Sequence, residues 1–265
     1  MSTLGFIGTG NMGGALAVAA AKNSGNVLLL SNRHREKADA LAAQIGGNVT
    51  DNETLASAAD FVFLGVKPQM FAALAEEIRK PLKGRRFPFV IVSMIAGKTM
   101  AEINEALGGD FAIIRILPNI PVKTGEGIIL WDCNEKVTEE QKEGFLSAMK
   151  YAGLLSEIDE AHMDAGSCVS GCGPAYAAMF IEALADGAVA CGLPRAKALE
   201  YAAMTVCGTA KLMLETGLHP GELKDAVCSP GGTTIQGVRA LENGGFRSAV
   251  MEAVIASYER TIGLG

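Results

Sequence analysis

The sequence predicts two folded parts, an N-terminal α/β domain with a doubly wound parallel sheet and an all-α C-terminal domain. Between residues 1 and 160, short runs rich in β-branched and aromatic residues alternate with helical patterns. These apolar runs lack polar alternation, which is typical of parallel strands that are buried on both faces. From 161 to 265 the sequence has long helical patterns and no convincing strand. We therefore place a domain boundary at residue 160.

Strands and helices follow one another at regular spacing in the first part. The first strand is expected at 3–8 and an Ala-rich helix at 12–22, and the next pair is expected at 26–32 and 35–44. Further strands are expected at 60–66, 89–93, 111–116 and 127–132. This order is typical of a sheet with helices on both faces.

The C-terminal part is predicted to contain five helices, at 174–191, 195–216, 220–227, 234–243 and 246–262. The helix at 174–191 is apolar around nearly its whole circumference, so it needs burial on all sides. A bundle of about 100 residues has too little interior for that. We therefore predict a homo-oligomer built on this region.

Composition and charge argue against several classes of protein. The chain has 265 residues, 49% of them hydrophobic and 20% charged, as in a folded globular protein. The net charge of −6 and the absence of a long basic cluster argue against a nucleic-acid partner. The apolar stretch at 165–181 is too short and too broken to span a bilayer, and the N-terminus is not a signal peptide. The six cysteines lack metal-ligand spacing. We expect a cytoplasmic protein with no membrane association and no metal site.

A glycine-rich turn follows the first strand, with the sequence Gly8-Thr9-Gly10-Asn11-Met12-Gly13. Between a strand and a helix, this GxGxxG spacing predicts a Rossmann-like dinucleotide site. The first glycine permits the tight turn, the second lets a pyrophosphate approach the backbone, and the third lets the helix pack on the strand. The helix N-terminus then offers free N–H groups to the phosphates. The structural alternative is a strand–turn–helix that binds nothing.

The end of the second strand favours NADPH, with NADH as an alternative donor. An NAD site usually has a carboxylate there for the ribose 2′-hydroxyl, but this sequence has Ser31-Asn32-Arg33. Hydroxyl, amide and guanidinium groups fit a 2′-phosphate, because arginine offers a planar fork and a permanent charge. The alternative is a solvated basic turn with no ligand.

Two later loops also follow strands, at the edge where an open α/β sheet binds its ligand. Val66-Lys67-Pro68 follows the third clear strand, and Ala96-Gly97 follows the fourth. Small residues there leave room for the ribose and nicotinamide. Lys67 either faces the cofactor or is a surface cation, and Pro68 suits a first helical position in both cases.

The chain resembles the pyrroline-5-carboxylate reductase family essentially from end to end. In the first part the resemblance is carried by GFIGTGNMGGA, SNR, GVKP and RILPNIP, and in the second by SGCGPAY, HPGELKDAVCSPGGTT and GGFRSAV. SPGGTT followed by GGFR in a helical tail is highly specific. Family members often have SGSGPAY, whereas this chain has Cys172 at the second serine, with the loss of a hydroxyl hydrogen bond.

The resemblance implies NAD(P)H-dependent reduction of L-1-pyrroline-5-carboxylate to L-proline, the last step of proline biosynthesis. It also implies that the helical half forms an intertwined dimer and that dimers associate into a larger ring. It places the substrate carboxylate on backbone N–H groups of the SPGGTT turn, the ring nitrogen at Thr234, the substrate near Glu160, and the cofactor near Asn52. The implied substrate-binding set is Glu160, Ser229, Gly231, Gly232, Thr233 and Thr234.

Other interpretations of the same residues exist. Thr233 or Thr234 can act as an ordinary helix N-cap. A β-hydroxyacid dehydrogenase shares the glycine motif and a helical second domain, but that family needs a lysine on the helix after its glycine turn, and 174–191 contains none. A non-catalytic NADP(H)-binding sensor has no reason to keep SPGGTT.

Overall fold

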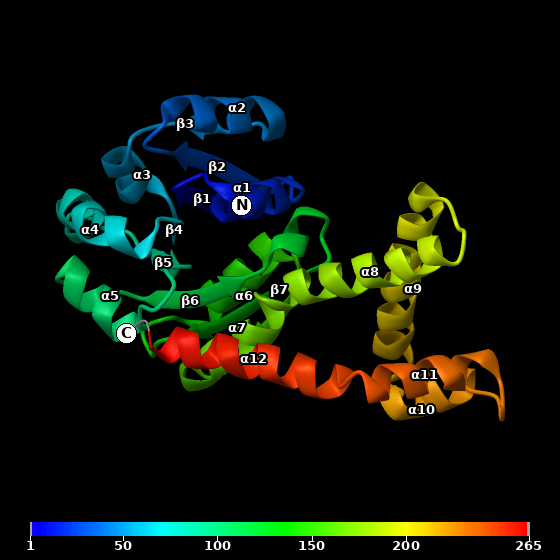
Figure 1. The fold of residues 1–265 in the computed structure, drawn as a ribbon. Helices are drawn as coiled ribbons and strands as arrows, with labels where there is room; N and C mark the ends of the chain where they lie inside the picture. Colours follow the sequence, from blue (N-terminus) through cyan, green and yellow to red (C-terminus); the bar gives the residue numbers. More distant parts are fainter. Residues whose placement is uncertain (1, 264–265) are drawn as a thin grey trace. The chain divides into compact units, whose positions relative to one another are not determined.

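One eight-stranded sheet forms the centre of the first part of the chain in the computed structural model, which describes residues 2–263 (Figure 1). Its strands are β1 (Ser2–Ile7), β2 (Asn26–Ser31), β3 (Asn48–Val49), β4 (Phe61–Leu64), β5 (Val90–Ser93), β6 (Ile113–Pro118), β7 (Gly127–Cys133) and β8 (Gly153–Glu157). They lie in the order β3-β2-β1-β4-β5-β6-β7-β8. All neighbours are parallel except β6 and β7. The predicted doubly wound sheet and its six predicted strands are confirmed.

The helices of this part cover both faces of the sheet. They are α1 (Asn11–Ala21), α2 (Arg35–Ile45), α3 (Asn52–Ala58), α4 (Pro68–Lys83), α5 (Met100–Leu107), α6 (Glu139–Met149) and α7 (Glu160–Ser170), with a short 3₁₀ turn, η1 (Ile120–Lys123). Side chains alternate along each strand, so β1 sends Leu4 and Phe6 to one face and Ile7 to the other. Each face therefore has its own apolar core.

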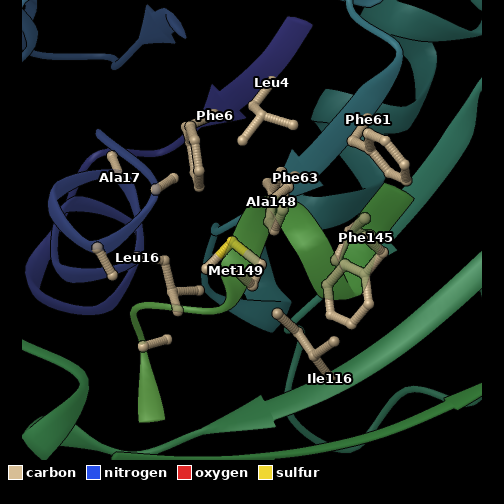
Figure 2. Close-up of a cluster of buried hydrophobic side chains, with 14 of the residues drawn as sticks. Leu4, Phe6, Leu16, Ala17, Phe61, Phe63, Ile116, Phe145, Ala148 and Met149 are labelled. Atoms are coloured by element: carbon tan, nitrogen blue, oxygen red, sulfur yellow. The ribbon is translucent and has the colours of Figure 1, made fainter. Parts of the chain in front are cut away.

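The first core lies between the sheet and helices α1 and α6 (Figure 2). Phe6 of β1 and Phe63 of β4 are fully buried, and their rings stack with centroids 4.4 Å apart. Leu16 of α1 and Phe145 of α6 belong to the same core. The second core holds the apolar sides of α3, α4 and α5, including Leu55, Phe71 and Ile103. Burial on both faces explains why the central strands read as uninterrupted apolar runs.

The sequence pattern gave no bounds for strands β3 and β8 or for helices α3, α4, α5, α6 and α7. β3 has only two residues, and the burial of β8 is irregular, so neither has a clear apolar period. Helix α7 precedes the first predicted C-terminal helix and packs on β7, where a Cβ on Gly166 would come 2.7 Å from Leu130. The predicted domain boundary at 160 coincides with the start of α7. The contacts of α7 join it to the first compact unit, which runs to Gly171 and takes in the chain from Tyr258 onward.

The second compact unit, Cys172–Ser257, is helical throughout. It contains α8 (Gly173–Ala190), α9 (Arg195–Thr216), α10 (Pro220–Val227), α11 (Thr233–Asn243) and most of α12 (Phe246–Ile262). All five predicted helices are present at the expected places. Residue 1 and residues 264–265, at the outer ends of the two predicted domains, lie outside the described residues.

The helical unit buries little of its own apolar surface. Its buried core consists of Ala185, Ala198 and Ala202. Large apolar side chains on the same helices are exposed, including Met179 at 69% and Leu214 at 85%. The stretch Glu160–Ala190 also passes a length-and-composition test for a membrane span, with mean hydropathy 1.3 and 17% of the tested window buried. It contains two helices, α7 and α8, rather than one uninterrupted helix.

Candidate functional site

Three glycines allow an unusually close approach of backbone at the end of β1. Gly8 has φ +96°, and a Cβ there would come 2.5 Å from the carbonyl oxygen of Gly65, which follows β4. A Cβ on Gly65 would in turn come 2.8 Å from the Gly8 oxygen, and a Cβ on Gly13 would overlap that same oxygen. The positive φ and the close approach of the Gly65 oxygen together exclude any side chain at Gly8. The first and third predicted glycine roles are therefore backbone packing roles.

Gly10 has open space where the other two glycines are packed. A Cβ on Gly10 would meet nothing within 4 Å. Gly10 is the N-cap of α1, and no side chain caps the helix there. The neighbouring hydroxyl of Thr9 is buried and has no hydrogen-bond partner among residues 2–263. A helix N-terminus with free N–H groups, open backbone and an unpaired hydroxyl fits a phosphate.

A cavity of about 540 Å³ opens at the carboxyl ends of β1, β2 and β4. Ile7 pairs with Ser31 on one side and Leu64 on the other, so the turns after the three strands begin at the same level. The order of strands reverses between β1 and β4, which is where open α/β sheets bind ligands. The cavity is lined by Ile7, Gly8, Gly10, Asn32, Arg33, His34, Lys37, Asn52, Gly65, Val66, Lys67, Met70, Ala73, Leu74 and Glu77. Its size and its cations fit a dinucleotide.

A chain of hydrogen bonds crosses the outer end of this cavity. The Ser31 hydroxyl donates to Oδ1 of Asn52 at 2.6 Å, and Nδ2 of Asn52 donates to Oε2 of Glu77 at 3.0 Å. Asn52 is the first residue of α3, whose N-cap Asp51 accepts the Thr54 N–H at 2.7 Å. The hydrogen bonds from Thr54 lower the pKa of Asp51 below its ordinary value, because they stabilise the carboxylate. A capped helix start thus holds Asn52 beside β2.

The structure brings about half of the predicted cofactor residues to this cavity. Seven line it, namely Gly8, Gly10, Asn32, Arg33, Asn52, Val66 and Lys67. Ser31 lines an adjoining cavity of about 400 Å³ together with Asn32, Arg33, Asn52 and Glu77. Thr9 and Asn11 line a third cavity of about 590 Å³ that also reaches Gly10.

Five predicted cofactor residues lie elsewhere. Met12 packs against the first core, and Gly13 packs on Gly8. Pro68 is the first residue of α4, as expected for a proline. Ala96 and Gly97 are exposed in the loop after β5, where Gly97 has φ +67°. The lining of the 540 Å³ cavity includes none of these residues.

Sequence reasoning missed several lining residues. Gly65 lies near the end of the predicted strand 60–66 and directly after the observed β4, so a glycine at the strand end in FLGVKP was a usable signal. His34 and Lys37 also line the cavity and lie just beyond the predicted residues Ser31-Asn32-Arg33. Met70 and Glu77 lie in the first and third turns of α4. Only the fold brings them to the residues that follow the second strand.

The SPGGTT turn joins α10 to α11 in the helical unit. Gly231 has φ +72°, and the Gly232 N–H donates to the Ser229 carbonyl at 3.0 Å. A Cβ on Gly232 would overlap the Ser229 hydroxyl oxygen, so a larger residue there would require that hydroxyl to rotate away. Thr233 and Thr234 are the first two residues of α11, and both are exposed.

The capping interpretation of the two threonines is wrong. The N-cap of α11 is Gly232, and no side chain accepts a hydrogen bond from the first turn. The hydroxyls of Thr233 and Thr234 stand one and two residues inside the helix, past the position from which an N-cap side chain bonds. The first turn of α11 therefore presents its N–H groups to solvent, as an anion site does.

Glu160 takes part in an ion cluster around the buried guanidinium of Arg115 within the first unit. Its Oε1 accepts from Nη1 of Arg115 at 3.3 Å and from the Met100 N–H at 2.9 Å, while Nη2 of Arg115 donates to Asp164 at 3.2 Å. The Glu160 N–H donates to Asp132 of β7 at 2.5 Å. The side chain of Arg115 is 4% exposed and that of Glu160 is 25% exposed. The cluster joins β6, β7, α5 and α7.

The fold and the cavity define a dinucleotide-binding protein of the NAD(P)-dependent oxidoreductase class. Residues 3–97 match a family model described as NADP oxidoreductase, coenzyme F420-dependent. Residues 160–264 match a model described as pyrroline-5-carboxylate reductase dimerisation.

Full-length relatives then show the family. The chain is 41% identical over 262 residues to a pyrroline-5-carboxylate reductase of Escherichia coli (strain K12), covering 97% of this chain and 96% of that one. The structure of a pyrroline-5-carboxylate reductase from Coxiella burnetii matches with a TM-score of 0.90 at 33% identity, over 100% and 98% of the two chains. A Plasmodium falciparum pyrroline carboxylate reductase with NADP bound matches with a TM-score of 0.88 at 30% identity, over 100% and 98%. The chain belongs to the pyrroline-5-carboxylate reductase family.

The ion cluster makes a testable contribution to stability. Replacing Arg115 with Met should lower the free energy of unfolding by roughly 1.5–3 kcal/mol, because two carboxylates lose charged hydrogen bonds. Urea unfolding measures the change. The triple variant R115M/E160Q/D164N should recover part of the loss, because no unpaired carboxylate remains at the cluster. If the single variant were as stable as the wild type, the cluster would make no net contribution to the free energy of unfolding.

Proposed function

We propose that the protein reduces L-1-pyrroline-5-carboxylate to L-proline, the last step of proline biosynthesis, with NADPH as the preferred donor and NADH as an alternative. The observation that carries the proposal is the SPGGTT turn, which presents an uncapped helix N-terminus in a chain of this reductase family. The substrate is a cyclic imine with a carboxylate, and the turn offers what a carboxylate needs.

The reaction asks for binding and orientation more than for acid–base catalysis. When bound, the reduced nicotinamide supplies the hydride to the imine carbon. An imine is already electrophilic, and its protonated form more so, so the chain's own residues have to hold and orient it. The nucleotide end of this task fits the free N-terminus of α1 and the open backbone at Gly10.

The substrate residues are assigned around the turn. The N–H groups from Gly231 to Thr234 hold the carboxylate, and Ser229 shapes the turn over Gly232. The exposed hydroxyl of Thr234 hydrogen-bonds the ring nitrogen. Glu160 is the remaining member of the proposed substrate-binding set, and one of its oxygens is already held by Arg115 and the Met100 N–H.

Replacing Thr234 with Ala should lower kcat/KM for pyrroline-5-carboxylate by on the order of a hundredfold, as expected for loss of a hydrogen bond to a reacting group. The melting temperature should stay close to that of the wild type, because the hydroxyl does not cap the helix. Thr209→Ala is the matched control, since its exposed hydroxyl bonds only the Thr205 carbonyl of its own helix. Full activity in the Thr234 variant would contradict its role.

The same assay separates the alternative functions. NADPH oxidation with pyrroline-5-carboxylate supports the proposal. Reduction of NADP⁺ with a 3-hydroxyacid supports a β-hydroxyacid dehydrogenase, and cofactor binding without turnover supports a sensor.

The preference for NADPH is assigned to the turn after β2. Asn32 and Arg33 line both cavities at that end, and Ser31 is tied to Asn52. A guanidinium there attracts a 2′-phosphate through charge and paired hydrogen bonds.

Replacing Arg33 with Ala should therefore raise KM for NADPH about tenfold or more while changing KM for NADH much less. Steady-state kinetics with each cofactor at saturating imine measures both. Arg35→Ala is the control, because Arg35 lines the adjoining cavity but not the main one. An unchanged preference in Arg33→Ala would place the 2′-phosphate elsewhere.

We also propose that a second copy of the chain covers the exposed apolar helices, forming an intertwined dimer, and that dimers associate into a larger ring. Support comes from the small core of the helical unit and from the match of residues 160–264 to the family's dimerisation region. We further propose a cytoplasmic location, with no membrane or nucleic-acid partner.

Light scattering during gel filtration should accordingly report a mass of at least two chains at micromolar concentration, because so much apolar surface needs cover. The elution volume should be the same with and without detergent in the buffer. A stable monomer in detergent-free buffer would contradict the proposed assembly.

A further inference from the structure

Helix α4 brings a carboxylate to the end of the cavity where the second strand has none. Glu77 lines both the 540 Å³ cavity and the adjoining 400 Å³ cavity, together with Asn32, Arg33 and Asn52. In the sequence Glu77 is more than forty residues from the basic turn, so the motif gives no sign of it. The usual acidic residue of an NAD site stands on the second strand itself, whereas here the acid comes from a crossover helix.

Glu77 is held in place by the polar chain that begins on β2. Nδ2 of Asn52 donates to its Oε2 at 3.0 Å, and Oδ1 of Asn52 accepts from the Ser31 hydroxyl at 2.6 Å. Both ends of the Asn52 amide are thereby engaged. Glu77 is an exposed residue of α4, and this hydrogen bond directs its carboxylate to Asn52 at the end of the cavity.

The charges at this end oppose each other. Arg33, Lys37 and Lys67 line the 540 Å³ cavity, and Glu77 is the one carboxylate among its described lining residues. Asp51 lines the adjoining cavity, but its two oxygens accept from the N–H and hydroxyl of Thr54. Glu77 is therefore the anion that a cofactor meets in the main cavity.

A carboxylate discriminates between the two forms of the ribose. It accepts a hydrogen bond from a 2′-hydroxyl, and it repels a 2′-phosphate, which carries more than one negative charge at neutral pH. Arg33 has the opposite preference. We propose that Glu77 is a specificity-determining residue that admits the 2′-hydroxyl of NADH and limits the preference for NADPH. This inference rests on the proposed placement of the cofactor in this cavity.

The alternative role for Glu77 is purely mechanical, as a prop for Asn52. Two substitutions separate these roles. Glu77→Gln keeps an oxygen that accepts from Asn52 and removes the charge, whereas Glu77→Ala removes both. Glu76→Gln is the matched control, because Glu76 is one residue earlier on the same helix, is exposed, pairs with Arg79 and does not line either cavity.

The experiment compares the two cofactors and two fragments of them. Wild type, the three Glu variants and Arg33→Ala are assayed with NADPH and NADH, and the binding of adenosine 2′,5′-bisphosphate and adenosine 5′-monophosphate is titrated by calorimetry. In Glu77→Gln the ratio of kcat/KM for NADPH to that for NADH should rise on the order of tenfold, as removal of one nearby like charge predicts. The bisphosphate should bind more tightly by a similar factor, the monophosphate should not, and Glu76→Gln should match the wild type.

Each alternative outcome has a definite meaning. An unchanged cofactor ratio in Glu77→Gln, with both cofactors weakened equally in Glu77→Ala, shows a prop and overturns the specificity role. In Arg33→Ala the ratio should fall. If that ratio stays constant, the cofactor placement itself is overturned, and this result is distinguishable because it appears in the arginine variant. The fragment titrations report on the ribose end without turnover, so they hold even if the chemistry at SPGGTT has been misassigned.

Discussion

The nucleotide half depends on one close contact, the meeting of backbone at Gly8 and Gly65. Each would place a Cβ within 3 Å of the other's carbonyl oxygen, so neither position tolerates a side chain. This contact lets the turns after β1 and β4 lie side by side at the point where the strand order reverses. The N-terminus of α1 then begins at the level where the cavity opens. The cavity is thus a consequence of backbone packing, and side chains only refine it.

Sequence patterns predicted what is local and missed what the fold brings from a distance. Apolar periodicity and glycine spacing are properties of short segments. They were therefore enough to predict the six main strands, the five helices of the second unit, and Gly8 and Gly10. Short edge strands such as β3 carry too few residues for a period. Glu77 could not be predicted for a different reason, since only the packing of α4 against α3 brings it to Asn52 and to the cavity. For the threonines of SPGGTT a local rule gave the wrong result. Hydroxyl residues often cap helices, but α11 begins one residue earlier than that rule suggested, with Gly232 as its N-cap.

On the proposed placement of the cofactor, the opposed charges of Arg33 and Glu77 provide a simple means of adjusting the choice between NADPH and NADH. Arg33 and Glu77 line the same space from different elements, the turn after β2 and helix α4. Asn52 hydrogen-bonds both Ser31 of β2 and Glu77 of α4, and so links the carboxylate to the second strand. Specificity of this kind is a difference between two affinities. It is therefore sensitive to single substitutions that leave the fold unchanged.

The three buried alanines of the helical unit have a consequence for the behaviour of the protein on dilution. Ala185, Ala198 and Ala202 bury too little apolar area to hold α8 and α9 together with much strength. Where a partner chain supplies the remaining contacts, mass action enters the folding equilibrium of this unit. Its melting temperature then rises with protein concentration. A variant with a destabilising substitution in α8 or α9 will accordingly stay folded in a concentrated stock but unfold in this unit at the lower concentrations used in assays.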